Sequence, residues 1–374
     1  MTVNYPDYYR EFQCIGGMCP DTCCGGWQIG IDEKTCRRYK RENGEFGKRL
    51  RKSIDFKNRC FIMEGSGCPF LNKEKLCDIY RHLGKESLCN TCRDYPRHME
   101  VYDGLREISL SLSCPEAARI ILEKKGKFSL IQKKGGSYEK ESRLLAILVK
   151  ARRVMFDIME NEYVDMNVRY AMILAMAHDM QLRLDKGKWE QIKEVLERYS
   201  AEGAAIRFEK KISGYRERTE EKRQHMSVYA GILKGLEGIT EIWPGKLGRV
   251  CEFLEDKKNY EKVHRDYFNY YRNNWYVYGN LMIYFLYVYF LGAVYDEQAY
   301  GKVKLAAVSC LMIQEMGASL FMEKGSFDGN DMVEEAHVYS REIEHSDFNL
   351  EGLERVLVNS SMFGLEKLLV CILS

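Results

Sequence analysis

The sequence predicts a mainly α protein in two parts, a small cysteine-rich α+β metal-binding domain followed by an α-helical bundle domain. Of the 14 cysteines, eleven lie between Cys14 and Cys114, among frequent glycines. After Pro115 only Pro244 interrupts a chain whose apolar residues recur at helical spacing. We therefore expect a cysteine-rich iron–sulfur (metal) domain at residues 1–120, a linker at 121–137 and a helical domain at 138–374.

Composition excludes several classes of function. The formal net charge of the 374 residues is only +2, whereas a nucleic-acid-binding domain carries a strong basic excess. The first residues contain no basic segment followed by an apolar run, so no secretory signal is expected. We expect a cytoplasmic protein, and in a reducing compartment clustered cysteines more often hold metal than form disulfides.

Short elements are predicted in the cysteine-rich domain. Asp32 is a suitable N-cap for a helix through Lys40, because its carboxylate can accept a hydrogen bond from the first turn. The segments around Cys68 and Cys77 flank the polar stretch 72–75, which is typical of a hairpin. In 106–113 apolar and polar residues alternate, which predicts a half-buried strand.

The second part follows a helical pattern. Leu144, Leu148 and Met155 lie on one face of a predicted helix, and the basic, glycine-containing stretch 124–137 before it marks the domain boundary. Helices are predicted at about 138–160, 164–185, 187–200, 222–237, 258–294, 299–321, 331–345 and 350–372.

One segment is long enough to cross a bilayer. No charged residue occurs from Asn273 to Tyr295, but the segment is rich in tyrosine, which favours membrane interfaces over the hydrocarbon centre. A helix buried in a bundle is the better interpretation, and no membrane insertion is expected. The tyrosines at 267–290 could instead form an aromatic channel around a lysine, although such a stripe is more often bundle core.

Nine cysteines in three blocks carry the strongest chemical signal. Thiolates are soft ligands for zinc and for iron–sulfur clusters, and close spacing lowers the entropy cost of ligation. Spacing alone does not choose between these metals, since both use four-cysteine sets. Nine thiols also exceed what one cubane cluster uses, so some are structural, serve a second centre or line the site. The candidate ligands are Cys14, Cys19, Cys23, Cys24, Cys68, Cys77, Cys89, Cys92 and Cys114.

Other residues have plainer explanations. Cys36 and Cys60 are more often ordinary thiols, and the three later cysteines fall in helical patterns. Trp27 either shields the metal centre or is core. Tyr95, before Pro96, either shapes a pocket or packs beside Cys92. The paired Arg37 and Arg38 predict a solvated face.

At these cysteines the sequence resembles the flagellin lysine N-methylases, the FliB family, with a YkgJ-type cysteine-cluster signature. A looser similarity extends from Asn269-Tyr-Tyr-Arg into the C-terminal half. The motifs that carry the resemblance are Phe12-x-Cys14 to Asp32, Cys68-Pro-Phe-Leu to Ile79, Leu88-Cys89-x-x-Cys92-x-x-Tyr95-Pro96-Arg97 and Leu112-Ser113-Cys114-Pro115-Glu116.

The resemblance implies an enzyme that moves a methyl group from S-adenosylmethionine to lysine ε-amines of flagellin. It also implies an iron–sulfur cluster, of the 4Fe-4S type, at or near the cofactor site. The alternative is a non-catalytic, zinc-stabilised protein-binding module. No Rossmann-type glycine loop announces a cofactor pocket, so we expect the pocket between the cysteine-rich and helical parts. No catalytic residue is assigned from the sequence.

Overall fold

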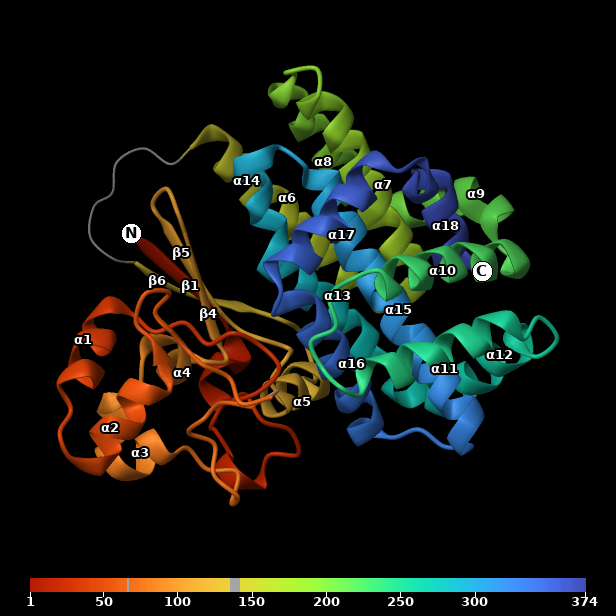
Figure 1. Ribbon diagram of the computed structural model, residues 1–374. Helices are drawn as coiled ribbons and strands as arrows, with labels where there is room; N and C mark the ends of the chain where they lie inside the picture. Colours follow the sequence, from red (N-terminus) through yellow and green to blue (C-terminus); the bar gives the residue numbers. More distant parts are fainter. Residues whose placement is uncertain (66, 135–141) are drawn as a thin grey trace.

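The computed structural model describes residues 1–65, 67–134 and 142–374. It confirms the mainly α class, with helices covering most of the chain beside a small four-stranded sheet and a two-stranded one. The cysteine-rich part and the sheet lie on one side of the molecule, and the bundle lies on the other (Figure 1). Helix α16 (Gly329–Glu344) packs against α5 (Pro115–Glu123) where the two parts meet.

The sheet has four strands in the order β4-β5-β1-β6. Strand β1 runs parallel to β5, with Thr2 opposite Leu105, and antiparallel to β6, with Pro6 opposite Leu130. The predicted strand at 106–113 is observed as β5, but its predicted faces are partly wrong. Glu107 and Ser109 are buried, whereas Ile108 is only half-buried, because Glu107 pairs with Arg152 of the bundle. The strands are β1 (Thr2–Pro6), β4 (Arg97–Tyr102), β5 (Leu105–Leu110) and β6 (Leu130–Lys134), with a separate pair β2 (Ile54–Asp55) and β3 (Cys60–Phe61).

The cysteine-rich region also has short helices around a core of its own. The Asp32 carboxylate caps the first of them as predicted, since its Oδ1 accepts the Thr35 N–H at 3.0 Å. The predicted hairpin is reduced to a single bridge between Leu71 and Cys77. The helices are α1 (Glu33–Arg41), α2 (Gly44–Lys52), α3 (Asp78–Leu83) and α4 (Asn90–Asp94).

Residues 121–137, predicted as a linker, contain the end of α5 and strand β6. Residues 135–137, and the first residues of the helix predicted at 138–160, lie outside the described residues. Because β6 pairs with the N-terminal strand, the sheet is built from both ends of the first 134 residues. Leu105 and Leu110 of the sheet join the core of the bundle, together with Tyr8 from the 3₁₀ turn after β1.

Most bundle helices lie close to their predicted places. The bundle begins with α6 (Arg143–Met159), α7 (Met166–Leu184), α8 (Ile192–Ser200), α9 (Ala204–Ile212), α10 (Thr219–Lys234), α11 (Trp243–Glu255), α12 (Tyr260–Tyr271), α13 (Tyr276–Tyr289) and α14 (Ala293–Asp296). They are followed by α15 (Ala299–Lys324), α16, α17 (Asp347–Asn359) and α18 (Leu365–Leu373).

Two long helices were wrongly predicted as continuous. The helix expected at 258–294 is interrupted by 3₁₀ turns at Arg272–Asn274 and Phe290–Gly292, where asparagine and glycine have poor helix propensity. The helix expected at 350–372 breaks at Ser361–Phe363, because the Ser360 hydroxyl accepts the Met362 N–H and Gly364 follows. Helices α9 and α11 were not predicted. Pro244 lies in the first turn of α11, where a proline does not interrupt the helix.

The apolar segment after Asn273 lies in the core of the bundle. Two stretches, Tyr276–Asp296 and Ala299–Lys324, are long and apolar enough to cross a membrane, but 72% and 78% of their apolar windows are buried inside the fold. Helices α13 and α15 pack against each other at the centre of the bundle. Tyr267, Tyr278 and Tyr284 are almost fully buried, so the tyrosine stripe is core and not an open channel.

Candidate functional site

Five of the predicted ligands belong to the small second core. Cys68 and Cys89 are buried in it beside Ile29 and Phe70, and three further cysteines pack against it. Their thiols also interact electrostatically, Cys68 with Cys77 and Cys89, and Cys92 with Cys24 and Cys68. We call this set the inner cysteines: Cys24, Cys68, Cys77, Cys89 and Cys92.

The remaining four predicted ligands form a second set, in which Cys14 and Cys23 are exposed and Cys114 is buried. The Cys19 thiol interacts with those of Cys14 and Cys23, and the Cys114 thiol with those of Cys19 and Cys23. We call these the outer cysteines: Cys14, Cys19, Cys23 and Cys114. Cys23 touches both sets, because its thiol also hydrogen bonds with Cys24. The nine thiols therefore divide into two neighbouring groups, which gives a physical reason for their exceeding one four-cysteine set.

Three of these cysteines begin helices. Cys77, Cys89 and Cys114 are the N-cap residues of α3, α4 and α5. Backbone N–H groups of the following turn act to lower the pKa of each thiol, those of Glu116 and Ala117 acting on Cys114. Free N–H groups at a helix start stabilise a thiolate, which is the form that binds metal.

Burial raises the thiol pKa values and so opposes the effect of those N–H groups. Burial raises the pKa of Cys68 to about 11 and that of Cys114 to about 12, despite backbone N–H donors to each sulfur. The Cys89 pKa is lowered because its sulfur accepts hydrogen bonds from the thiol and N–H of Cys92. Such thiols ionise readily only when a cation replaces the lost water, as a metal centre does.

The nine thiols are soft donors of the kind that both zinc and iron–sulfur clusters use. In the part of the chain that the structure describes, no three His, Cys, Asp or Glu side chains are arranged to hold one metal ion. A cubane cluster, however, spaces its ligand sulfurs farther apart than a single ion does. Soft, helix-capping thiols in a desolvated core fit an iron–sulfur cluster chemically.

The other cysteines have protein partners. Gln28 donates its side-chain N–H to the Cys60 sulfur at 3.2 Å, and Cys36 is buried in α1 with its thiol toward the Ile31 carbonyl. Cys310 and Cys371 are buried in the bundle, and Cys251 packs against its core.

Helix α16 of the bundle holds the loop that contains Cys23 and Cys24. Arg341, only 4% exposed, forms an ion pair with Asp21 and donates to the carbonyls of Thr22, at 3.1 Å, and Gly25. Its contacts thus lie on both sides of the adjacent cysteines. Gly26 has φ +81°, and a Cβ there would stand 2.9 Å from the Ile239 carbonyl oxygen, so the loop approaches the bundle closely.

Three nitrogen side chains at four-residue spacing line this side of α16. They are His337, Arg341 and His345, the last being the C-cap of the helix. Each carries a buried nitrogen without a hydrogen-bond partner: His337 Nδ1, Arg341 Nε and His345 Nδ1. None of the three was predicted as a site residue, because helical spacing alone does not show which residues face another part of the chain.

His345 lies in a group of rings beside the outer cysteines. Its imidazole centroid is 4.8 Å from that of Trp27 and 5.9 Å from that of Tyr95. The Trp27 indole N–H donates to the Cys23 carbonyl at 3.0 Å. Trp27 and Tyr95 therefore belong to the junction between the cysteines and the bundle.

Hydroxyl groups connect His345 to the carboxyl of Glu344. His345 Nε2 is 2.8 Å from Ser113 Oγ, which is 2.6 Å from Ser111 Oγ. Ser111 in turn donates to Glu344 Oε2 at 3.4 Å, and the Tyr284 hydroxyl donates to the same oxygen at 2.8 Å. Burial raises the pKa of Glu344, whereas burial and the Arg341 cation lower that of His345 to about 3. His345 is thus a neutral imidazole at physiological pH.

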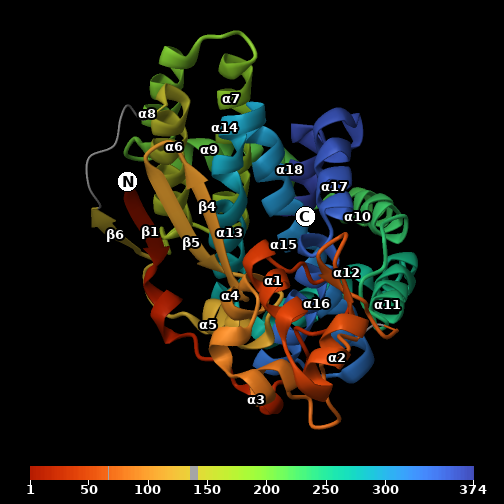
Figure 2. The same cartoon turned by 60° about the vertical axis from the view of Figure 1, so that its left-hand side comes forward.

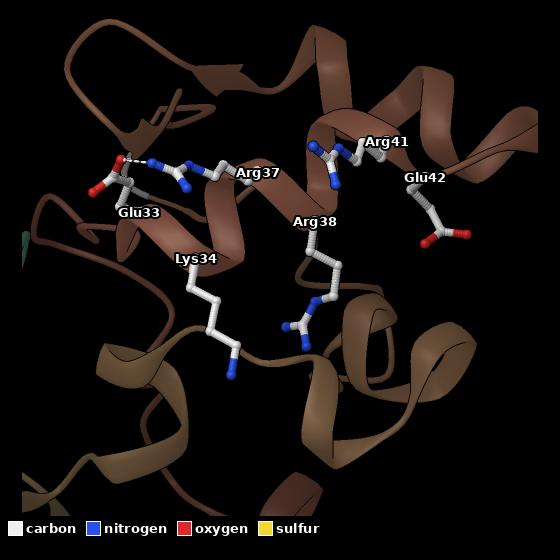
Figure 3. A pocket seen from close by; sticks show the side chains of 6 residues that line it. All are labelled: Glu33, Lys34, Arg37, Arg38, Arg41 and Glu42. Atoms are coloured by element: carbon white, nitrogen blue, oxygen red, sulfur yellow. Dashed lines mark hydrogen bonds and ion pairs between the residues drawn. The ribbon is translucent and has the colours of Figure 1, made fainter.

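A hollow of about 520 Å³ lies elsewhere, over α1 (Figure 3). Its lining is charged, with Lys34 and Arg41 exposed and Arg37 paired to Glu33. Arg38 is not simply solvated as predicted, because it donates to the carbonyls of Glu86 and Ser87. No thiol lines this hollow, so the junction at α16 is the better candidate site.

Comparison with known proteins identifies similar chains. Residues 152–371 match the family model of the FliB lysine N-methylase C-terminal domain. The flagellar biosynthetic protein FliU of Salmonella muenchen is 31% identical over 146 residues, which cover 37% of this chain and 86% of that protein. The lysine-N-methylases of Salmonella typhimurium and Salmonella choleraesuis are each 30% identical over 142 residues, which cover 36% of this chain and 35% of theirs. The matched part spans about a third of the length of those lysine-N-methylases. No solved structure matches the chain.

Proposed function

This chain belongs to the FliB lysine N-methylase family, and from that premise we propose that it transfers methyl groups from S-adenosylmethionine to lysine ε-amines of flagellin. Lysine methylation is the activity of the family, and the flagellar name of one relative favours a flagellar substrate. We place the proposed activity where the two cysteine sets lie against α16, because Arg341 of that helix contacts the loop of Cys23 and Cys24. We expect the protein to act in the cytoplasm, where its thiols stay reduced.

We propose that an iron–sulfur cluster of the 4Fe-4S type is held by the inner cysteines, with the outer cysteines lining the site or serving a second centre. When bound with one iron open, such a cluster would supply an anchor for the amino and carboxylate groups of S-adenosylmethionine. The chain's own part is to place the thiols. Cys77 and Cys89 do so from helix starts, and Arg341 holds the loop of Cys23 and Cys24.

Methyl transfer to lysine requires the neutral amine. An ordinary lysine has a pKa near 10.4, so at pH 7 only about one in a few thousand carries a free lone pair. The junction favours the neutral form by two means, removal of water and the nearby Arg341 cation, which together also lower the His345 pKa. Orientation of the amine toward the methyl carbon supplies the rest of the rate enhancement.

Purification without oxygen followed by metal analysis tests the cofactor. A brown protein with stoichiometric iron and broad visible absorption is expected, and a perturbed spectrum on adding S-adenosylmethionine would support anchoring at the cluster. A colourless protein with stoichiometric zinc would overturn the cluster and favour a zinc-stabilised binding module. An unchanged spectrum with S-adenosylmethionine fully bound would overturn anchoring alone.

Activity is tested separately with flagellin and S-adenosylmethionine carrying a labelled methyl group. Label on flagellin lysines, located by mass spectrometry, is the expected result. A flagellin in which the labelled lysines are changed to arginine is the control, because arginine keeps the positive charge but not the ε-amine. Absence of transfer by iron-loaded protein would overturn the proposed activity.

A further inference from the structure

His345 differs from an ordinary buried histidine because one of its ring nitrogens has no partner. Nδ1 is shielded from water and accepts no hydrogen bond, while Nε2 contacts Ser113. Leaving a buried polar atom without a partner is unfavourable, so a hydrogen-bond donor that reached Nδ1 would be bound favourably there. The chemistry of the donor depends on whether Nδ1 carries a proton.

The surrounding hydroxyl groups determine the tautomer. Four hydroxyls converge on the Glu344 carboxyl, from Tyr284, Tyr289, Ser340 and Ser111. Since Ser111 donates its single proton to Glu344, its oxygen accepts from its other neighbours, the Ser113 N–H and the Ser113 hydroxyl.

The same reasoning then fixes the next bond. Ser113 has donated its hydroxyl proton to Ser111, so its oxygen can only accept from Tyr95, at 3.1 Å, and from His345. In that arrangement of protons His345 carries its proton on Nε2, and Nδ1 is a bare lone pair. Glu344, Ser111 and Ser113 act as positioning residues. The hydrogen bonds that connect them to His345, 2.6 to 3.4 Å long, favour this tautomer.

The electrostatic surroundings decide what Nδ1 can do. The charged and titratable groups about it are Arg341 and Glu344 from α16, Asp21 from the cysteine loop and Tyr95 after α4. They and burial leave His345 too weak a base to remove a proton from an ordinary lysine, whose pKa is near 10.4. A neutral imidazole can still accept a hydrogen bond from a neutral amine.

We propose that His345 Nδ1 binds the ε-amine of the substrate lysine by accepting one of its N–H bonds, and so aims the nitrogen lone pair at the methyl donor. This inference rests on the proposed function. Before the transfer the ammonium loses a proton to solvent water. The nitrogen then forms a bond to the methyl carbon as the sulfonium S–C bond breaks, and the product is a methylated ammonium and a neutral thioether. The Trp27 and Tyr95 rings pack against the His345 ring, and the Trp27 indole N–H donates to the Cys23 carbonyl.

Two substitutions separate amine binding from a structural role. His345→Asn keeps an acceptor near the Nδ1 position but loses the contact with Ser113, whereas His345→Gln keeps a group near Nε2 but loses the acceptor at Nδ1. With a single-lysine peptide, His345→Gln should lower kcat/KM by about tenfold or more, the loss expected for one hydrogen bond. His345→Asn should stay within about threefold of the wild type.

The reverse order, with Gln active and Asn impaired, would overturn the proposal and leave His345 a structural partner of Ser113. Loss of iron from either variant would also overturn it, because His345 would then be a metal ligand. Both variants are compared with the wild type for iron content and helical circular dichroism.

A readout that does not depend on methyl transfer keeps this test apart from the proposed function. Nitrogen-15 NMR of histidine-labelled protein should show His345 protonated at Nε2, with its signal identified by its absence from His345→Asn. Saturating n-butylamine should shift the Nδ1 resonance. An Nε2 lone pair, or no shift with butylamine, would overturn the inference even in an active enzyme. Failure of methyl transfer with a normal butylamine shift would instead overturn the proposed function.

Discussion

Arg341, in the bundle, forms an ion pair with Asp21, two residues before the adjacent Cys23 and Cys24. This contact joins positions 320 residues apart in the sequence. Because Arg341 also donates to carbonyls at Thr22 and Gly25, it fixes the backbone on both sides of the two thiols. The geometry of the candidate metal centre thus depends on a residue outside the cysteine-rich region.

The first prediction concerns this clamp, the contacts of Arg341 with Asp21, Thr22 and Gly25. Arg341→Met removes three hydrogen-bonding contacts from the loop, and we expect lower iron content and weaker visible absorption, with a loss of about 1–3 kcal/mol in unfolding free energy. Iron analysis and urea unfolding of anaerobically purified protein measure both effects.

The matched control is Arg216→Met, which removes an exposed ion pair with Glu209 on the other side of the bundle. It should change neither iron content nor stability appreciably, since exposed pairs contribute little. Equal iron loading of the two variants and the wild type would show that the clamp does not position the thiols.

The second prediction separates ligands from ordinary thiols. Cys89→Ser removes an inner thiol at a helix start and should strongly reduce bound iron, because a hydroxyl is a poor ligand for a soft metal centre. Cys36→Ser, in the same core but with its own partner, should retain iron. Iron-to-protein ratios and absorption spectra compare the two; retention by Cys89→Ser together with loss by Cys36→Ser would reverse our assignment.

The third prediction concerns the joint between sheet and bundle. Arg152 on α6 and Glu107 on β5 form a bidentate ion pair, 2% and 5% exposed, and Arg152 also donates to the Tyr287 carbonyl at 3.0 Å. Arg152→Met leaves the Glu107 carboxylate buried and unpaired, which should cost about 3–5 kcal/mol of unfolding free energy.

Adding Glu107→Leu to Arg152→Met should recover much of that loss, because the unpaired charge is then removed. Urea unfolding of the two variants and the wild type measures the recovery. If the double variant is as unstable as the single one, lost packing and not the isolated charge explains the effect.

Much of the bundle could be predicted because its signal is local. Apolar spacing located α7 and α15 within a few residues, and the charge-free segment at 273–295 was correctly placed in the core. The breaks at Arg272–Asn274 and Ser361–Phe363 were missed, since apolar periodicity continues through both. Strand β1 escaped prediction because its parallel pairing with β5 joins residues about a hundred positions apart.

The candidate site shows the same division. The cysteine blocks stood out from spacing alone, whereas the pocket expected between the two parts stays a prediction. The local sequence did not identify His345 and Glu344 as site residues, because their hydrogen-bond partners, Ser113 and Ser111, lie more than two hundred positions earlier. The sequence predicts Ser111 only as a residue on the polar face of a strand. It does not decide whether Tyr95 shapes a pocket or packs in a turn beside Cys92.

The last prediction is a pH dependence of stability. Burial and Arg341 lower the pKa of His345 to about 3 in the folded protein, from an ordinary value of 6.5 in the unfolded chain. Between these values the unfolded state binds more protons, so stability falls as the pH is lowered through this window. From pH 7 to pH 5 the wild type should lose about 2 kcal/mol more than His345→Asn, which cannot titrate. Urea unfolding of both proteins at several pH values provides the measurement, and parallel curves would show that His345 is not held neutral by the fold.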